Sequence, residues 1–401
     1  MSPPWSVGPA LFSDDAVDFA RLRERSHGLR WATVPADVIP LTAAEPDFPV
    51  ALPIREAVNQ YLDGGLLAYA PPEGLPELRQ AAADMLVRRR GLRASPANIF
   101  VTDGVASGMH IVARLALSPG DEAIVFDPVD FLFKAAVDSA GGAVKRCRVD
   151  PQRGVLELHT LSGLLHPRTR LLAICNPHNP VGRVLTRDEL WQLGNFAVEH
   201  DLWILADEVW SDIVYAPHRH ISIASLSPAI AARTFTLMGT SKSFGLSGAR
   251  VGFIHAPTPE LVGKLVDVAG ARTTAYGVST LAQAAATAAF TVGYPWVEAF
   301  VTHLARMRDL VVGRLNQIDG VSCRCPEGTY VAFPNLRSFA MSSESLTSHL
   351  LDKARVAVVP GSARWFGPGA ADHIRICFST SEGILTQALD RIEQALRDLR
   401  R

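Results

Sequence analysis

The sequence predicts an α/β fold in which a large domain holds a mostly parallel, seven-stranded sheet and a smaller domain mixes helices with short strands. Two patterns support this prediction. Between residues 99 and 256, short apolar runs rich in β-branched residues alternate with amphipathic stretches of helical period. Such alternation is typical of a doubly wound parallel sheet. Beyond residue 290, a long helical stretch is followed by several short apolar runs, which indicates a smaller α+β unit.

The strands expected in the large domain alternate with segments long enough to form crossover helices. They are Asn98–Thr102, Glu122–Phe126, Ala143–Val149, Arg170–Cys175, Leu202–Ala206, Thr234–Met238 and Val251–His255. Helical patterns at Ser107–Leu117 and Arg187–His200 separate some of them. Ligands of such sheets bind beyond the carboxyl ends of the strands. We expect one pocket to form there from the residues that follow four of the strands, namely Gly104, Asn176, Asp207 and the pair Ser241–Lys242.

The C-terminal part is expected to begin with a helix that ends near Gln317 and to close with a helix over Ile384–Leu399. Between them we expect short strands at Val321–Cys325, Tyr330–Phe333, Val356–Val359 and Ile374–Phe378. The chain is therefore predicted to divide into a large domain, residues 51–290, and a C-terminal small domain, residues 291–401. Residues 1–50 are expected to pack with the small domain.

Composition narrows the range of functions. Lys and Arg number 39 against 40 Asp and Glu in 401 residues, so the net charge of −1 gives no basic field for nucleic acid. The run Arg88-Arg89-Arg90 is expected to be a solvated helix end. Five cysteines in an odd, mostly scattered set suggest neither a disulfide framework nor a zinc site, so we expect no metal and a reducing compartment. The start Met1-Ser2-Pro3-Pro4-Trp5 lacks a leader pattern, and no apolar segment is long enough for a bilayer, which predicts a cytoplasmic protein.

Residues 240–250 carry the strongest chemical signal, because Lys242 stands among hydroxyl and small residues with Arg250 eight positions later. A lysine amine with an ordinary pKa of ~10.4 is almost fully protonated at neutral pH, so burial or nearby cations must lower that pKa before the amine can attack a carbonyl. Hydroxyls and an arginine suit a phosphate dianion. A lysine beside a phosphate cradle suggests pyridoxal 5′-phosphate (PLP) held as a Schiff base.

Several separated motifs accompany this lysine. Residues 69–79 read Tyr-Ala-Pro-Pro-Glu-Gly-Leu-Pro-Glu-Leu-Arg, residues 103–108 read Asp-Gly-Val-Ala-Ser-Gly, residues 176–180 read Asn-Pro-His-Asn-Pro, and residues 373–380 read His-Ile-Arg-Ile-Cys-Phe-Ser-Thr. With these motifs in this order, the chain resembles the PLP-dependent enzymes of fold type I, specifically the class I/II aminotransferase superfamily. The resemblance covers roughly residues 40 to 400 and implies the PLP-dependent transferase fold.

The resemblance implies catalytic and substrate-binding roles. Lys242 would form the Schiff base and later remove the α-proton of an amino-acid substrate. Asp207 would keep the pyridine nitrogen protonated, so that the ring can accept electrons. Asn179 would donate to the pyridine 3-oxygen beside the substrate. Arg375 would clamp the substrate α-carboxylate through two parallel hydrogen bonds.

The resemblance also implies a phosphate site. The backbone N–H groups of Val105 and Ala106, at the start of a helix, would bind the phosphate, as helix N-termini favour anions. Thr240 and Arg250 would complete the site in the same subunit. Tyr69 would reach the phosphate of a neighbouring subunit, which implies a homodimer with shared active sites.

Three positions depart from a standard transaminase of this superfamily. Ala44 takes the place of a usual glycine whose backbone approaches the substrate carboxylate. Asp130 falls where an aromatic ring usually stacks on the cofactor, so either Phe131 shifts into that place or a carboxylate lies beside the ring. Trp210 stands where many transaminases have a tyrosine that bonds to the 3-oxygen, which leaves more of that bonding to Asn179.

Other details resemble the cystathionine β-lyase-type C–S lyases of the same superfamily. These are the Asn-Pro-His-Asn-Pro turn, the Asp207–Asp212 spacing and the stretch His218-Arg219-His220-Ile221. We therefore expect β-elimination from a cysteine S-conjugate, giving a thiol, pyruvate and ammonia. The alternatives are a class I/II aminotransferase and a specialised-metabolite enzyme of the lincosamide type, which cleaves a C–S bond or decarboxylates and oxidatively deaminates. A regulatory protein of this fold without turnover would need a DNA-binding domain, for which the sequence has no spare length.

Overall fold

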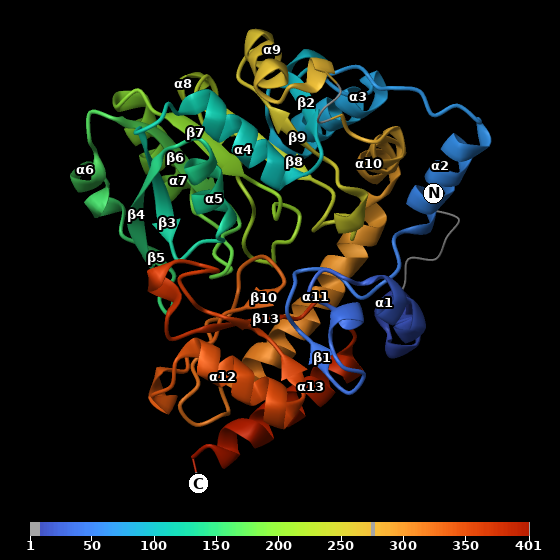
Figure 1. Cartoon of the computed structure of the whole chain (residues 1–401), viewed down its shortest axis with the longest axis vertical. Coiled ribbons are helices and arrows are strands. Elements are labelled where there is room, and N and C mark those ends of the chain that lie inside the picture. The colour runs from blue at the N-terminus through green and yellow to red at the C-terminus, as the bar shows by residue number, and fades with distance from the viewer. Residues whose placement is uncertain (1–8, 274–276, 401) are drawn as a thin grey trace.

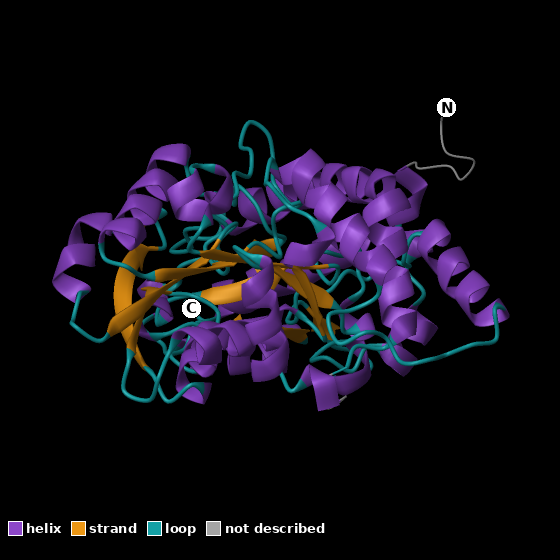
Figure 2. Ribbon diagram, turned by 90° about the horizontal axis from the view of Figure 1, so that it is seen from above, coloured by secondary structure: helices purple, strands orange, loops and turns teal. Residues whose placement is uncertain are grey.

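The computed structural model describes residues 9–273 and 277–400, and it places a layer of strands between layers of helices (Figures 1 and 2). The first residues, on which the expectation of no leader rests, lie outside the described part. In that part, no helix combines the length and the apolar character needed to cross a bilayer. All five cysteines are free thiols.

The central sheet has eight strands, one more than expected. Their order is β2 (Ile99–Thr102), β9 (Gly252–His255), β8 (Thr234–Gly239), β7 (Trp203–Asp207), β6 (Thr169–Cys175), β3 (Glu122–Asp127), β4 (Ala143–Asp150) and β5 (Val155–Leu156). The strands from β8 to β4 run parallel, whereas β9 is antiparallel to both of its neighbours. The seven predicted strands are all present. The extra strand, β5, is a two-residue antiparallel partner of β4, too short to leave a periodic signal.

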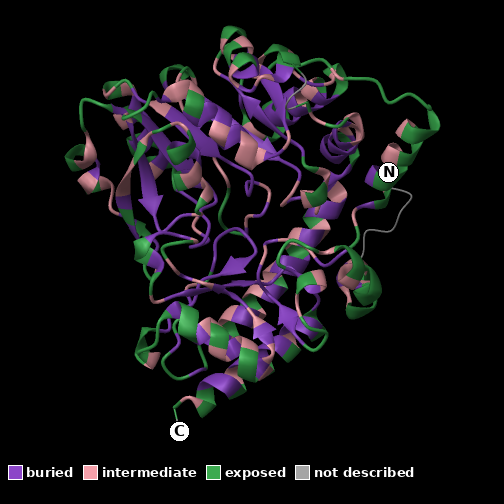
Figure 3. Cartoon of the chain, viewed as in Figure 1, coloured by how far each residue is buried: buried purple, intermediate pink, exposed green. Residues whose placement is uncertain are grey.

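Helices connect these strands and cover both faces of the sheet (Figure 2). They are α2 (Leu52–Asp63), α3 (Pro76–Met85), α4 (Val105–Ala116), α5 (Leu132–Ser139), α6 (Leu161–Leu164), α7 (Arg187–Glu199), α8 (Pro228–Ala231), α9 (Pro259–Val268) and α10 (Thr280–Val292). Local sequence fixes their starts: Thr186 and Glu189 form a capping box at α7, and Gly104 precedes α4. β3 and β8 are buried along their whole length, and β7 is buried except at Trp203, so the sheet is the core of this part (Figure 3).

The long helix α11 (Tyr294–Leu315) leads from the central sheet to the C-terminal part (Figure 1). There β13 (Ile374–Cys377) pairs antiparallel with β10 (Val331–Ala332) on one side and β12 (Val359–Pro360) on the other. The helices of this part are α12 (Ser343–His349) and α13 (Glu382–Asp398). The N-terminal segment carries α1 (Phe19–Arg25) and joins this part through β1 (Ile39–Pro40), which pairs parallel with β11 (Val356–Ala357). The domain boundaries near residues 50 and 290 stay predictions.

Two of the short strands expected in the C-terminal part are wrong in detail. Val321–Cys325 forms a single bridge, between Ser322 and Asn335, instead of a strand. The side chain of Asn316 bonds to both the N–H and the C=O of Cys323, at 2.7 and 2.9 Å, and so takes the place of a neighbouring strand. The stretch 356–359 is two strands, because the chain changes from β1 to β13 as its pairing partner at Val358.

Candidate active site

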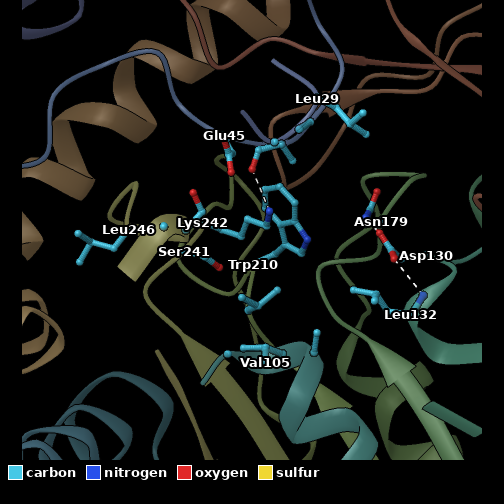
Figure 4. A pocket seen from close by; sticks show the side chains of 18 of the residues that line it. Leu29, Glu45, Val105, Asp130, Leu132, Asn179, Trp210, Ser241, Lys242 and Leu246 are labelled. Atoms are coloured by element: carbon cyan, nitrogen blue, oxygen red, sulfur yellow. Dashed lines mark hydrogen bonds between the residues drawn. The ribbon is translucent and has the colours of Figure 1, made fainter. Parts of the chain in front are cut away.

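A cavity of about 760 Å³ opens where β2, β6, β7 and β8 end, and β13 contributes to its opposite boundary. Every residue predicted for the site lines this cavity except Thr240 and Tyr69. Figure 4 shows Lys242, Trp210, Asn179 and Asp130 projecting into the same space. The expectation that residues following four strands converge on one pocket holds for Gly104, Asp207 and the pair Ser241–Lys242; Asn176 itself does not line the cavity, but Asn179 of the same turn does.

Lys242 follows β8, and its Nζ donates a hydrogen bond to the carbonyl oxygen of Ala44 at 2.8 Å (Figure 4). The same Nζ lies 5.3 Å from the centre of the Trp210 ring. Burial, followed by the positive charge of Arg375, lowers the pKa of Lys242. A lysine with a lowered pKa holds more free amine at neutral pH, as a nucleophile or a general base requires.

Asp207 is the last residue of β7, and only 8% of it is exposed. Its Oδ1 accepts the backbone N–H of Val209 at 3.1 Å. Burial raises the pKa of Asp207 to about 7. A buried carboxylate is stabilised in its charged form by a positively charged N–H partner, so this position suits a protonated ring nitrogen.

The start of α4 faces the cavity with the backbone of Val105 and Ala106. Gly104 before it has a φ of 135°, and a Cβ at this position would lie 2.9 Å from Nη2 of Arg250. Glycine therefore leaves room for the Arg250 guanidinium beside the helix start. Thr240 is fully buried, and its hydroxyl has no hydrogen-bond partner among the described residues. Thr240 does not line the cavity directly.

Arg375 lies on β13 and is buried. Its Nη2 donates to the carbonyl oxygen of Thr42 at 3.0 Å, and its Nη1 donates to Oδ1 of Asn179 at 3.3 Å. Asn179 in turn donates from Nδ2 to Oδ2 of Asp130 at 2.9 Å. The guanidinium predicted to bind a carboxylate is thus joined to Asp130 through one amide.

The two residues considered for the aromatic position take different places. Asp130 directs its carboxylate to Asn179, within the cavity. Phe131 is 40% exposed and packs edge-on against Trp365, with ring centres 5.5 Å apart. Both line the cavity, and Asp130 is hydrogen-bonded to another predicted site residue, Asn179. The structure therefore brings a carboxylate, and not a shifted phenyl ring, into contact with Asn179.

Tyr330, which sequence reasoning missed, contacts both Trp210 and Ala44. The hydroxyl of Tyr330, a fully buried residue just before β10, donates to the carbonyl oxygen of Ala44 at 3.0 Å, so this oxygen accepts from both Tyr330 and Lys242. The Trp210 and Tyr330 rings lie edge to face with centres 4.6 Å apart. Tyr330 gave no chemical signal, because an aromatic residue at the start of a short strand is indistinguishable from a core residue in the sequence.

Two other lining residues were also missed. Glu45 lines the cavity, and its negative charge raises the pKa of Lys242 against the larger effect of burial. Its place next to Ala44 was the available signal. Trp365 lines the cavity from the stretch Gly361–Gly367, where an aromatic pair between glycines marked a loop that could reach a ligand.

Tyr69 lies away from this cavity, in the connection between α2 and α3 at the edge of the molecule (Figure 1). It is 90% exposed. It lines a separate surface hollow with Gln283 and residues 277–281. The predicted role of Tyr69 in a neighbouring subunit therefore stays a prediction.

The residues around the cavity fit PLP. The buried Thr240 hydroxyl without a partner among the described residues, the Arg250 guanidinium beside Gly104 and the start of α4 suit its phosphate. The Asp207 carboxylate, with its raised pKa, suits the ring nitrogen. Lys242, with its lowered pKa, suits the carbonyl carbon.

Comparison with known proteins agrees with this chemistry. A family model described as aminotransferase class I and II matches residues 36–392. The aspartate aminotransferase of Pyrococcus abyssi is 35% identical over 366 residues, 90% of this chain and 92% of that protein. The aromatic-amino-acid aminotransferase 2 of Thermococcus litoralis is 35% identical over 368 residues, with the same two shares.

Solved structures give the same result. The aromatic aminotransferase from Pyrococcus horikoshii OT3 matches with a TM-score of 0.85 and 35% identity over 91% of this chain and 97% of that one. Cystalysin from Treponema denticola, which contains PLP, matches with a TM-score of 0.87 but only 23% identity, so that likeness shows the fold alone. The relatives support the aminotransferase alternative, and the expected resemblance to C–S lyases is not supported. PLP is the cofactor of this enzyme, and the chain belongs to the class I and II aminotransferase family.

Proposed function

We propose that this enzyme is an amino-acid aminotransferase in which Lys242, Asp207 and Arg375 carry the chemistry. The observation behind the proposal is that a lysine of lowered pKa, a buried carboxylate and a buried arginine line one cavity. Relatives named as aspartate and aromatic-amino-acid aminotransferases support transamination over the C–S cleavage that the sequence favoured.

PLP, when bound, supplies an electron-accepting ring that makes the α-proton of an amino acid acidic. In the proposed site, Asp207 would accept a hydrogen bond from the ring nitrogen and keep that nitrogen protonated. Val105, Ala106, Thr240 and Arg250 would hold the phosphate.

Arg375 would orient the substrate by its α-carboxylate. Its Nε is buried and has no protein partner among the described residues, and its Nη atoms bond only to uncharged groups. An incoming carboxylate would therefore meet a positively charged guanidinium that still has donor capacity.

Lys242 would move the proton. Its free amine would take the α-proton of the substrate as a general base and would return a proton, as a general acid, to the carbon that the cofactor's carbonyl supplied. Proton delivery to that carbon, instead of loss of a group from the β-carbon, is what distinguishes transamination from elimination. The pKa of Lys242, lowered by burial and Arg375, brings the amine closer to the working pH. The Ala44 carbonyl, 2.8 Å away, holds Nζ in the cavity.

We also propose a homodimer, in which Tyr69 contributes to the partner's phosphate site, and a cytoplasmic location. The high exposure of Tyr69 and of the neighbouring Leu66 and Leu67 supports the first proposal, since an apolar stretch of this kind is stabilised by a covering surface. The five free thiols support the second.

A second candidate is β-elimination from a cysteine S-conjugate. The observation in its favour is the Asp130 carboxylate at a position where the resemblance implies an aromatic ring. This departure changes the surroundings of the substrate without changing Lys242 or Asp207. The same observation favours the specialised alternative, in which the enzyme decarboxylates and oxidatively deaminates its substrate.

One experiment separates the candidates. PLP-loaded enzyme is given aspartate or phenylalanine with and without 2-oxoglutarate, and L-cystathionine or S-methylcysteine without any keto acid. An aminotransferase turns over only when the keto acid is present. Release of pyruvate and thiol without it would establish β-elimination instead, and O2 consumption with CO2 release would establish oxidative decarboxylation. Lys242→Ala enzyme controls for reactions of free PLP.

A further inference from the structure

Asp130 stands between the end of β3 and the start of α5, with its side chain half-buried at the cavity wall. Its Oδ1 accepts the backbone N–H of Leu132 at 3.1 Å, and its Oδ2 accepts Nδ2 of Asn179 at 2.9 Å (Figure 4). The first bond fixes the carboxylate on its own loop. The second joins it to a turn that follows a different strand, β6.

The amide of Asn179 is held between opposite charges. Its oxygen accepts from Nη1 of Arg375 at 3.3 Å, and its nitrogen donates to Asp130 at 2.9 Å. An amide has one acceptor end and one donor end, so an arginine on one side and a carboxylate on the other allow a single orientation. Asp130 and Arg375 together therefore also fix the direction of the second N–H of the Asn179 amide.

The charge of Asp130 also acts on its neighbours. It raises the pKa of Lys242 and of Arg375, in each case against the larger lowering by burial. Glu45 raises the pKa of Lys242 in the same sense, and Arg375 lowers it. Asp207, the last residue of β7, and the Cys377 thiol on β13 also interact electrostatically with this lysine.

We propose that Asp130 is a positioning and specificity-determining residue, which fixes the Asn179 amide and weakens the binding of carboxylate ligands by offsetting the charge of Arg375. This inference rests on the proposed roles of Lys242 and Arg375. A site with Arg375 alone would hold any small carboxylate, including the keto-acid product, more tightly. With Asp130 present, the site favours ligands that also bring a positive charge, as an amino acid does through its ammonium group and a keto acid does not.

The test uses PLP-loaded Asp130→Asn and Asp130→Leu enzymes. Asparagine keeps a hydrogen-bond acceptor for Asn179 and removes only the charge, whereas leucine removes both. Two quantities are measured: the midpoint of the pH titration of the visible absorbance, and the dissociation constant of 3-phenylpropionate, a carboxylate without an amino group. For Asp130→Asn we expect the midpoint at lower pH, because the variant loses a negative charge that favours protonation of the Lys242 nitrogen. We expect 3-phenylpropionate to bind roughly tenfold more tightly, because that negative charge no longer offsets Arg375.

Controls make the outcomes distinct. Asp138→Asn removes the same charge from an exposed residue of α5 and should leave both quantities at wild-type values. Asp130→Glu restores the charge and should return the midpoint toward wild type, so the inference stays testable if one variant folds poorly. Unchanged midpoint and unchanged affinity in both Asp130→Asn and Asp130→Leu would overturn it. If wild-type enzyme supplied with PLP shows no visible absorbance, the proposed cofactor site is overturned instead.

Discussion

The active-site cavity has a floor and a wall that are built in different ways. The floor consists of residues at the ends of strands of the central sheet or just beyond them: Gly104, Asp207 and Lys242. The wall consists of Ala44, Asp130 and Arg375, which come from three segments far apart in the chain. Pairing between strands positions the floor residues. Hydrogen bonds between side chains, and from side chains to backbone carbonyls, position the wall residues. We therefore propose that the floor binds the cofactor and that the wall selects the substrate and the reaction type.

The floor has an additional support beneath it. Arg90 forms a buried ion pair with Asp212, and Asp212 accepts the hydroxyl of Ser243, next to Lys242, at 2.8 Å. The side chains of Arg90 and Asp212 are 8% and 7% exposed. The expectation of a solvated arginine run is therefore wrong for Arg90, although Arg88 and Arg89 are exposed. The ion pair ties the helix end after α3 to the lysine loop.

The largest effect is expected at the floor. Lys242→Ala removes the amine that lines the proposed carbonyl site, so the visible absorbance that borohydride reduction abolishes should be absent and turnover should fall below detection. Absorbance spectra with added PLP, before and after borohydride, check this. Persistence of a reducible chromophore in the variant would place the linkage on another lysine.

Asp207→Asn should lower turnover by about three orders of magnitude or more while PLP still binds. An amide cannot hold a proton on the ring nitrogen by charge, so the ring becomes a weaker electron acceptor. Turnover and PLP content are measured on the same preparation. Wild-type turnover in a fully loaded variant would refute the role of Asp207.

A wall substitution should act mainly on binding. Arg375→Lys replaces a planar fork by a single ammonium, so KM for the amino acid should rise by about 100-fold, with a smaller fall in kcat. Steady-state kinetics give both values, and the absorbance of the bound cofactor should stay at its wild-type position. A fall in kcat alone would instead make Arg375 part of the proton-transfer machinery.

The support beneath the floor should affect stability more than chemistry. Asp212→Asn leaves the buried Arg90 guanidinium without its charge partner, which should lower the free energy of unfolding by about 3 kcal/mol. Urea denaturation measures the loss, and Asp309→Asn, an exposed acidic residue of α11, is the matched control. Chromophore formation should survive. Its loss in folded Asp212→Asn enzyme would show that Ser243 positions Lys242 more directly than we infer.

The last prediction concerns the pH dependence of stability and leaves activity aside. The pKa of Asp207 is raised from 3.8 to about 7 in the folded protein without cofactor, so the folded state keeps a proton that the unfolded state has released. The stability contributed by this proton is complete below pH 3.8 and is lost as pH rises toward about 7. Cofactor-free wild type should therefore lose more stability over this range than cofactor-free Asp207→Asn. Urea denaturation of both proteins at several pH values measures the free energy of unfolding. An equal change of this free energy with pH in the two proteins would contradict the raised pKa.

The sequence by itself determined the floor. Apolar runs of strand period are local signals, and each of the seven predicted strands lies within one residue of its observed bounds. The lysine among hydroxyls and the carboxylate that ends a buried strand are local as well, so PLP and the positions of Lys242 and Asp207 could be inferred from the order of residues alone. The relatives do not support the expected C–S cleavage. The short motifs that pointed to it stand on a scaffold that lyases and aminotransferases share.

Only the tertiary structure decided which contacts the wall residues, and Arg90 beneath the floor, make. Three hydrogen bonds join residues far apart in the sequence. Asp130 and Asn179 are 49 residues apart, Arg375 and Thr42 are 333 apart, and Arg90 and Asp212 are 122 apart. No periodicity records such a pairing, since each partner is chosen by how distant segments pack together. The same holds for stretch 356–359, where one apolar run divides between two sheets. Short-range pattern sets where a strand or helix lies, and the contacts between folded segments set what a carboxylate or a guanidinium can do.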